Sequence, residues 1–513
     1  VLALGVSLYY DFFVEYHEHP FPKSSDAFLI TLLVSLGLSL TFRYIGRKAT
    51  DIFHRKESIL VVAFIWIIAS AISALPFLLT KTLDRPIDAY FESVSGLTTT
   101  GASTLFPKKY NAVTGQEEKI VITDHECPIR KYEFYGNISR VWDPSIDSYR
   151  TGFDAISKPV LFWRSLIQWI GGVGIVFVFI ALLPALAIGG KFLFEAESLK
   201  PSPDTIAPRV KETARYLWII YLGLTIAQII LLMVTNPSIN FFHAVITSFS
   251  TISTGGFSVH SNSIAGYGSA TTDWIVMLFM VLGAINFALY FYLFRGKFAR
   301  LKDPEFYFFL ISIVVTCGLA VWKLWGFDTH AFRNGCFQII SSLTCTGFFN
   351  TNYEIWPYAP QAMMLICMYI GGMTGSTAGG IKSARHLILF RSFKYRTERL
   401  FRPDSVQTLR LGQKEISNDS LFNTFNFFWT IIIIATFGMM LLIFDNIDLE
   451  TSISIIGCCM NNTGLAFRAV GPEGTFAILS PFAKVISMIW MLLGRLEFFA
   501  FLILLIPSFW RSK

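Results

Sequence analysis

Length, composition and charge indicate an integral membrane protein and exclude a string of soluble domains. The chain has 513 residues, of which 53% are hydrophobic, 16% aromatic and only 15% charged, whereas soluble domains carry about 25% charged residues. The formal net charge of +7 is interpreted as the excess of Lys and Arg in cytoplasmic loops, so it predicts no nucleic-acid partner. The 7 cysteines have no metal-ligand spacing, and their odd number argues against a disulfide framework.

Apolar segments long enough to cross a bilayer recur along the chain, since a spanning helix needs about 20 such residues. Residues 1–16 look like the end of one span. Basic clusters follow every second crossing, which predicts that they are cytoplasmic; they lie at 43–56, 191–215, 295–302, 382–414 and 511–513. The other candidate spans are 27–45, 58–80, 159–188, 214–235, 272–294, 305–326, 361–393, 421–444 and 479–509, and the last ones include long segments expected to tilt or break.

Four apolar segments of about a dozen residues are too short to span. Each follows a full span, precedes another, and ends in a Thr-Gly pair, which predicts a short re-entrant helix followed by a turn. This unit occurs four times in parallel orientation and is an internal repeat. The segments are 87–98, 240–252, 331–344 and 449–461, and the glycines that end them are Gly101, Gly255, Gly347 and Gly464.

The predicted fold is an all-α integral membrane protein with four M1–pore-loop–M2 repeats around a pseudo-fourfold pore. Two transmembrane helices precede the repeats. A polar insertion at about 107–157 in the first repeat is expected to form an extracytoplasmic cap. The predicted division is 1–57 for the accessory helices, then 58–190, 191–302, 303–414 and 415–513 for the repeats, with cytoplasmic loops opening the second repeat and closing the third.

The Thr-Gly turns have the chemistry of a cation pathway. A bare cation in hydrocarbon costs tens of kcal/mol, so something must replace its water. Backbone carbonyls do so without net charge, and Gly permits the backbone conformation that aligns them. A single Thr-Gly pair is an ordinary turn, but four at the same place favour a filter. The predicted filter residues are Thr99, Thr100, Gly101, Ser253, Thr254, Gly255, Cys345, Thr346, Gly347, Asn462, Thr463 and Gly464.

A glycine-rich tract from Gly371 to Gly380 interrupts the span at 361–393. Because Gly costs about 1 kcal/mol in a helix interior, the tract is predicted to be unwound and to face the pore. The alternative is close helix packing through small residues. The tract resembles an ATP-binding Walker A loop, but Ile381 separates Gly380 from Lys382 and no strand precedes it, so ATP binding is rejected.

Arg495 lies in the last apolar segment, where an ionisable residue is costly and usually functional. The alternatives are a structural contact of Arg495 with Glu497 or with backbone, or snorkelling from a tilted helix. Lys382, directly after the glycine-rich tract, is expected either to act like Arg495 or to mark the cytoplasmic boundary.

These motifs resemble the Trk/Ktr/HKT superfamily of potassium transporters, and most closely the pore-forming subunit of its Trk branch. The resemblance covers nearly the whole chain and includes the stretches from Gln168 to Gly174 and from Gly371 to Lys382. In that family one Gly per repeat forms the filter, four glycines accompany potassium preference, and Ser in the first repeat favours sodium; Gly101 therefore implies potassium. The insertion at 107–157 departs from the usual family pattern.

The resemblance also implies a gate and partners. In the family the loop matching 371–380 obstructs the pathway beneath the filter, and an Arg faces it. The expected assembly is a homodimer in the lipid of the bacterial inner membrane, with one pore per protomer and a cytosolic nucleotide-binding ring. The implied gate residues are Gly371, Gly372, Thr374, Gly375, Ser376, Thr377, Gly379, Gly380, Lys382 and Arg495.

The predicted function is potassium uptake through a multi-pass pore subunit that is not an enzyme and carries no cofactor. Whether permeation is channel-like or a symport with protons or sodium stays open. The alternatives are a sodium-permeable or sodium-coupled relative, a membrane-embedded enzyme subunit, and a non-conducting scaffold or receptor. The sequence shows no intramembrane His pair or catalytic dyad, and a scaffold does not require four equivalent turns.

Overall fold

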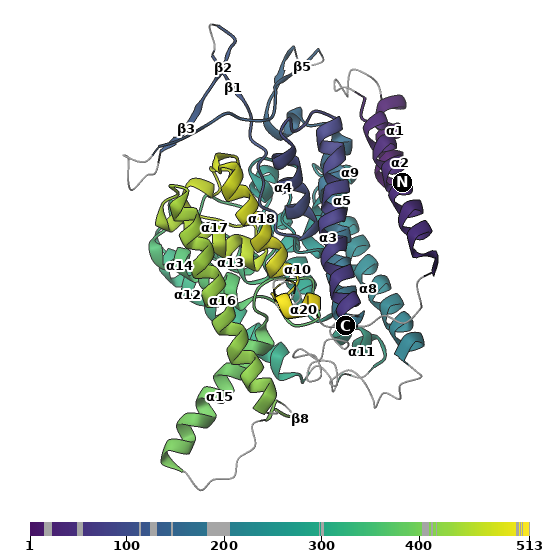
Figure 1. Cartoon of the computed structure of the whole chain (residues 1–513). Helices are drawn as coiled ribbons and strands as arrows, with labels where there is room; N and C mark the ends of the chain where they lie inside the picture. The colour runs from purple at the N-terminus through teal and green to yellow at the C-terminus, as the bar shows by residue number, and fades with distance from the viewer. Residues whose placement is uncertain are drawn as a thin grey trace.

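Long and short helices alternate along the chain (Figure 1). The computed structural model describes residues 1–14, 23–48, 55–111, 114–123, 131–144, 147–181, 206–296, 298, 302–402, 410–411, 414–416, 418–498, 502, 504 and 506–511. The predicted basic residues Lys191, Lys200, Lys297 and Arg300, and part of the spans at 159–188 and 479–509, lie outside these residues.

Two helices precede the repeats, as predicted. They are α1 (Leu2–Phe12) and α2 (Ser25–Ile45), which ends in the 3-10 turn η1 (Gly46–Lys48). α1 packs on α2 and on a helix of the first repeat, and the pair stands at the edge of the bundle in Figure 1. The outer surface of α2 is apolar, with Leu33 and Leu40 exposed, as expected for a helix that faces lipid.

Each of the four repeats contains a long helix, a short helix and a second long or broken helix. The four short helices confirm the predicted re-entrant segments to within one residue at either end. The elements are α3 (Arg55–Leu79), α4 (Pro86–Leu97) and α5 (Lys158–Ala181); α8 (Ile206–Thr235), α9 (Phe241–Ile252), α10 (Ala270–Ala284) and α11 (Phe287–Phe294); α12 (Pro304–Leu324), α13 (Ala331–Leu343), α14 (Tyr358–Ile370) and α15 (Ser383–Phe401); and α16 (Asn418–Phe444), α17 (Leu449–Asn461), α18 (Pro481–Arg495) and α20 (Pro507–Arg511).

The short helices begin where the sequence provides start signals. Pro86 stands at the first position of α4, where its missing N–H is not needed. The side chain of Asn240 caps α9 by accepting from His243 N at 2.8 Å, and Asp448 caps α17 by accepting from Thr451 N at 2.8 Å. Three of the four short helices therefore begin at a start signal, whereas α13 begins without a side-chain cap.

The second helix of each repeat packs against the short helix of the next one. α5 contacts α9, α10 contacts α13, α14 contacts α17, and α18 contacts α4. These four contacts close a ring in which the first and last repeats are neighbours. The predicted pseudo-fourfold arrangement is confirmed, and it brings the four turns that follow the short helices to the centre of the bundle.

The segment 272–294, predicted as one continuous span, is broken, and so is 479–509, one of the last segments, among which long ones were expected to tilt or break. The segment 272–294 bends by 92° between α10 and α11, where Asn286 Oδ1 accepts from Ala288 N at 2.8 Å and starts a new helix. The segment 479–509 stops at Arg495, because Glu497 and Phe498 adopt positive φ. Apolar composition measures length but contains no signal for such turns. The segment 361–393 is interrupted from 371 to 382, as predicted.

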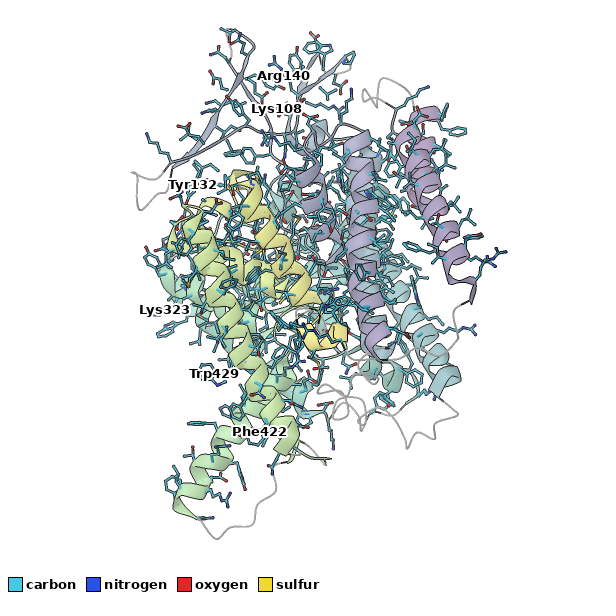
Figure 2. The ribbon with its side chains drawn as sticks, viewed as in Figure 1. Lys108, Tyr132, Arg140, Lys323, Phe422 and Trp429 are labelled. Atoms are coloured by element: carbon cyan, nitrogen blue, oxygen red, sulfur yellow. The ribbon has the colours of Figure 1, made fainter. Side chains whose placement is uncertain are left out.

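Five described helical segments are long and apolar enough to cross a membrane, or six if the bent α10–α11 pair counts as one span. Together with the broken helices they indicate a multi-pass membrane protein. Figure 2 shows Phe422 and Trp429 projecting from α16, and their side chains are 63% and 64% exposed, as expected for residues facing lipid. The segments are Ser25–Ile45, Leu60–Leu79, Ala214–Thr235, Pro304–Leu324 and Ser420–Phe444.

The insertion of the first repeat contains three β-hairpins, and the described chain outside it is helical apart from one further short hairpin. It lies at the opposite end of the molecule from α15, and Figure 2 shows Lys108 and Arg140 on it. Tyr132 ties this cap to the fourth repeat by donating to Asp448 Oδ2 at 2.6 Å. The antiparallel pairs are β1 (Lys109–Tyr110) with β2 (Glu117–Glu118), β3 (Ile120–Thr123) with β4 (Lys131–Phe134), and β5 (Val141–Asp143) with β6 (Ser148–Arg150); β7 (Arg410–Leu411) and β8 (Lys414–Glu415) pair elsewhere.

A buried ion pair closes the ring between its last and first repeats. Lys484 Nζ of α18 lies 2.6 Å from Asp88 Oδ1 of α4, with side chains only 4% and 7% exposed. We expect Lys484→Met to lower the free energy of unfolding by roughly 3–5 kcal/mol, because Asp88 is left as an unpaired buried charge. Thermal unfolding of the purified protein in detergent measures this loss.

Two controls accompany this variant. Lys119→Ala removes an ion pair with Glu133 whose side chains are about half exposed, and it should cost less than about 1 kcal/mol. Replacing both buried partners, in Lys484→Met with Asp88→Leu, should recover much of the stability. An unfolding midpoint for Lys484→Met equal to that of Lys119→Ala would contradict the assignment.

Candidate functional site

The four short helices end in the same hydrogen-bonded turn. In every repeat a backbone N–H donates to the carbonyl five residues earlier, as in a Schellman motif. This bond fixes the register of the four turns without reference to the side chains. The bonds are Thr100 N to Ser95 O at 2.8 Å, Gly255 N to Ser250 O at 2.8 Å, Thr346 N to Ser341 O at 2.9 Å, and Thr463 N to Cys458 O at 3.0 Å.

The residue before each of these donors adopts the left-handed backbone conformation. The φ angles are 54° for Thr99, 53° for Thr254, 53° for Cys345 and 51° for Asn462. Asn tolerates this region, whereas β-branched Thr is strained there. Strain that recurs at equivalent positions and is held by the surrounding structure is typical of functional segments.

The residue after each donor is a glycine whose Cα lies against the next repeat. The φ angles of these glycines run from 77° to 93°, and in each case a methyl group in place of the Cα hydrogen would overlap a neighbouring carbonyl oxygen. The contacts form a closed ring of four turns, each called a corner below, and the close approach at each corner explains why this chain has Gly there. They are Gly101 on the carbonyl of Gly255, Gly256 on that of Thr346, Gly347 on that of Thr463, and Gly464 on that of Thr100.

The assignment of Gly255 as the counterpart of Gly101 is wrong, and the counterpart is Gly256. Gly255 takes the place that Thr100 occupies in the first repeat, as the hydrogen bond to Ser250 O shows. Gly256 has the positive φ of 80° and contacts the next repeat. The sequence offers two adjacent glycines, and the Thr-Gly pattern selects the first. Alignment on the Gly-Phe pairs Gly256-Phe257 and Gly347-Phe348 would have selected the second.

The predicted filter residues all lie in this ring. Gly101, Gly347 and Gly464 are partly buried, and the other predicted filter residues are buried. The hydroxyls of Thr99 and Thr463 and the side-chain oxygen of Asn462 have no hydrogen-bond partner in the described part of the chain. Among the described residues no group of three or more His, Cys, Asp or Glu could hold a metal ion. An ion in the ring would therefore be met by backbone carbonyls and neutral side-chain oxygens.

The stretch from Gln168 to Gly174 holds the turns from behind. Gln168 Nε2 donates to Gly255 O at 2.5 Å, and its Oε1 accepts from Phe257 N at 3.1 Å. A methyl group on Gly171 would overlap Leu97 O at the end of α4. The pattern identifies a family from sequence, but its contact with the second repeat could not be deduced before the ring was known.

A buried ion pair within the first repeat links α5 to α4, and its arginine also contacts the second repeat. Arg164 donates to Glu92 Oε1 at 2.9 and 2.6 Å, and both side chains are almost completely buried. Glu92 also accepts from Ser103 and from the backbone N–H of Thr104, while the Arg164 guanidinium lies 4.0 Å from the ring centroid of Phe257. Neither residue was singled out from the sequence, although a charged residue in an apolar span is the signal that could have found Arg164.

The glycine-rich tract forms a loop against the C-terminal ends of two short helices. Thr377 Oγ1 donates to Ile252 O at 2.9 Å and to Gly283 O at 3.0 Å. Gly380 N donates to Asn461 O at 3.1 Å. A methyl group on Gly379 would overlap the same Asn461 carbonyl. The tract is unwound, as predicted, and it lies directly on the side of the ring where the short helices end.

The remaining loop residues bind the loop to its surroundings. Thr374 N donates to the buried carboxylate of Glu305 at 2.7 Å, and Ser376 Oγ donates to Met373 O at 2.6 Å. Three glycines let the loop fold on itself, because a methyl group would meet Gly379 O from Gly371, Ala378 from Gly372, and Gly371 from Gly380. A methyl group on Gly375 would instead meet Asn286, at the start of α11. Glu305 was not predicted from the sequence.

Arg495 connects the loop to the first repeat. Its Nη1 donates to Thr377 O at 3.0 Å and its Nη2 donates to Gly171 O at 3.3 Å. Of the predicted alternatives, the structure shows the backbone contact and not the pair with Glu497, which is bound to Arg385 at 2.5 Å. The side chain of Lys382 is buried as well, and its Nζ donates to Ala378 O within the same loop.

A family model described as TrkH, a cation transport protein, matches residues 134–325 and 327–512. The chain belongs to this family. The match confirms the resemblance inferred from the motifs, and it places the chain among transport proteins and not among enzymes.

Individual relatives agree with this assignment over nearly the whole chain. The Trk system potassium uptake protein TrkH of Salmonella typhimurium is 31% identical over 495 residues, which are 95% of this chain and 92% of that protein. TrkG of Escherichia coli K12 is 31% identical, over 96% and 93% of the two chains. The crystal structure of the potassium transporter TrkH from Vibrio parahaemolyticus has a TM-score of 0.81 at 29% identity and covers 99% of this chain and 96% of that one.

The ring contacts make Gly256 of this TrkH-family chain intolerant of any side chain. We expect Gly256→Ala to cost several kcal/mol, because a methyl group adds left-handed strain and also meets a rigid carbonyl. Gly268→Ala is the matched control: Gly268 has φ 58° and open space around it, so only the strain of about 1–2 kcal/mol remains. Thermal unfolding in detergent compares the two, and equal midpoints would refute the ring contact.

Proposed function

We propose that this chain takes up potassium ions across the bacterial inner membrane through the ring of four glycine turns. The observation that carries the proposal is the closed ring itself, in which each glycine lies against the carbonyl of the next repeat. Such a ring presents equivalent backbone carbonyls from four directions. The relatives that cover nearly the whole chain are named potassium uptake proteins, which supports potassium as the ion.

The proposed filter replaces the water of the ion with carbonyl oxygens. A cation that meets four carbonyls per layer does not pay the desolvation cost of hydrocarbon. The four short helices direct their C-termini, and hence their partial negative poles, toward the ring. The proposed ligands are Thr99, Thr100, Gly101, Ser253, Thr254, Gly255, Gly256, Cys345, Thr346, Gly347, Asn462, Thr463 and Gly464, that is, the predicted set with Gly256 added.

Potassium preference is proposed to depend on glycine at all four corners. A Ser in place of Gly101 would put its Cβ on Gly255 O, so the turns of the first and second repeats must separate or tilt. Their carbonyls would then no longer match an ion that requires four equal distances. This argument applies to the first repeat, where family members with Ser favour sodium.

Tracer uptake tests the function directly. Proteoliposomes containing the purified chain should take up rubidium or potassium tracer, and sodium should compete weakly. Gly101→Ser should lose that preference while remaining folded, as checked by size-exclusion chromatography. Gly268→Ala, far from the ring contacts, is the control. An absence of cation flux, with or without the cytosolic partner, would remove the pore interpretation, and equal competition by sodium would make the chain a sodium-permeable relative.

The loop from Gly371 to Gly380 is proposed to gate this pathway. It contacts the ends of α9 and α17, on the side of the ring toward α15. Arg495 brings a positive charge to the loop and binds Thr377 O. The proposed closed state therefore combines a physical obstruction with a charge that repels cations. Lys382 contributes a second buried amine, bound to the loop at Ala378 O.

We expect Arg495→Gln to raise basal tracer uptake severalfold, because the loop loses both its repelling charge and much of its tie to α5. Rubidium uptake at matched protein density in proteoliposomes is the measurement. Arg385→Gln serves as the control. It removes the neighbouring ion pair with Glu497 and a hydrogen bond to Ile381 O, which lies beside the start of α15 and outside the loop from Gly371 to Gly380. Uptake in Arg495→Gln at or below the wild-type rate, in a folded protein, would contradict the gate.

The oligomeric state and the cytosolic partner are also part of the proposal. The relatives' names describe a system of components, and the helix α15 presents five arginine or lysine side chains from Arg385 to Arg399 at the end of the molecule away from the cap. We propose a homodimer in which each protomer has its own pore, with a cytosolic nucleotide-binding subunit below it. The repeat boundaries given above are proposed as the structural units of the chain.

A further inference from the structure

The ring is not symmetric behind its second corner, and this difference concerns Gln168. In three repeats a Thr precedes the ring glycine, but in the second repeat Gly255 does. The place that a Cβ of Gly255 would take is filled by Gln168, whose Cδ and Oε1 lie 2.5 and 2.6 Å from that position. At the second corner, the space of a side chain at position 255 is therefore occupied by Gln168, which comes from α5 of the first repeat.

The carboxamide of Gln168 holds the residues on both sides of Gly256. Oε1 accepts from Phe257 N at 3.1 Å, and this bond fixes the orientation of the amide, since only the oxygen can accept. Nε2 then donates to Gly255 O at 2.5 Å. Of the four carbonyls that contact ring glycines, only that of Gly255 accepts a hydrogen bond from the described part of the chain.

The equivalent positions of the other repeats are apolar. Glycines that pack on the short helix identify them: Gly171 lies on Leu97 O, Gly283 on Ile252 O and Gly494 on Met460 O, each oxygen being four residues before a ring glycine. In the third repeat we take Gly371, which ends α14, as the counterpart from its place in the sequence. Three residues before each of these four glycines stands a fully buried side chain. They are Gln168, Met280, Met368 and Met491.

Repeats one and three brace their corners with their own short helix instead. Ser95 Oγ donates to Ala102 O at 2.6 Å, and Ser341 Oγ donates to Phe348 O at 2.7 Å. The counterpart in the second repeat, Ser250, donates to Ser165 of α5. The backbone after Gly256 is thus held by α5 and not by α9.

We propose that Gln168 is a positioning residue of the ion filter, which sets potassium preference by clamping the backbone around Gly256. The proposal rests on the proposed function of the ring. The clamp fixes the direction of the Gly255 carbonyl and satisfies the buried Phe257 N–H. Without it, the carbonyl can turn and one ligand of the layer adapts to a smaller ion, because preference depends on the number and fixity of the carbonyl ligands.

Gln168→Met tests the clamp with a side chain that the other three repeats already place there, so packing volume is nearly conserved. We expect the rubidium-over-sodium preference in proteoliposomes to fall about tenfold, the effect of one or two lost hydrogen bonds. The unfolding midpoint should fall as well, because the Phe257 N–H loses its acceptor. Gln228→Met is the matched control. It removes a buried amide bond to Thr251 of α9, at 3.0 Å, that does not reach the ring.

Two further variants keep the test decisive if Gln168→Met does not fold. The pair Gln168→Met and Gly255→Thr gives the second corner the residues of the other corners and should recover part of the preference. Gln168→Glu can donate to Gly255 O only when protonated, so its preference should rise as the pH falls from about 9 to about 5, whereas the wild-type ratio should not.

The outcomes separate the two levels of the argument. A wild-type protein without potassium preference overturns the proposed function and this inference with it. If the wild type is selective, three results would overturn the inference alone. They are an unchanged rubidium-over-sodium preference in Gln168→Met, an equal loss of preference in Gln228→Met, or no added pH dependence in Gln168→Glu. Loss in Gln168→Met, with retention in Gln228→Met, supports the clamp.

Discussion

The contact on which the rest of the structure depends is the approach of each ring glycine to the carbonyl of the next repeat. It leaves no room for a side chain, so the four turns can meet only if every short helix ends at the same height. The second helix of each repeat meets this requirement by packing on the short helix of its neighbour. A shift of one helix would therefore disturb two corners, which makes the ring a property of all four repeats together.

Holding that contact requires strain, and the structure shows where the strain is offset. Thr99, Thr254 and Cys345 keep a left-handed backbone, which costs about 1–2 kcal/mol each in an L-residue. The bond from the following N–H to the carbonyl five residues earlier recurs at every corner. Behind them, Gly171, Gly283 and Gly494 allow the long helices to approach the short ones at backbone distance. The glycines thus fall into two groups: one forms the contacts of the ring, and the other lets the long helices pack closely behind it.

Much of this could be predicted from the sequence, because length and apolarity distinguish a short re-entrant helix from a span. The same signals could not separate Gly255 from Gly256, since the choice depends on a hydrogen bond to Ser250 and on contact with another repeat. They also missed the bend at Asn286, which is set by a single side-chain cap inside an apolar segment. Gln168 and Glu305 were not assigned because their partners are distant in sequence: that of Gln168 lies in the second repeat, and that of Glu305 lies in the loop of its own repeat.

Four repeats in one chain can diverge, and the structure indicates what that freedom is used for. In a symmetric tetramer a clamp such as Gln168 would occur four times and would demand four glycines in place of Thr100 and its counterparts. Here Gln168 binds one corner, whereas at the other corners Thr precedes the glycine, and the positions that correspond to Gln168 are buried Met. The loop from Gly371 to Gly380 likewise occurs once, and Arg495 ties it to α5, the helix that holds the clamped corner. Loop and clamp therefore share α5 as a support, so in the proposed gate a movement of the loop would act on the helix that carries Gln168.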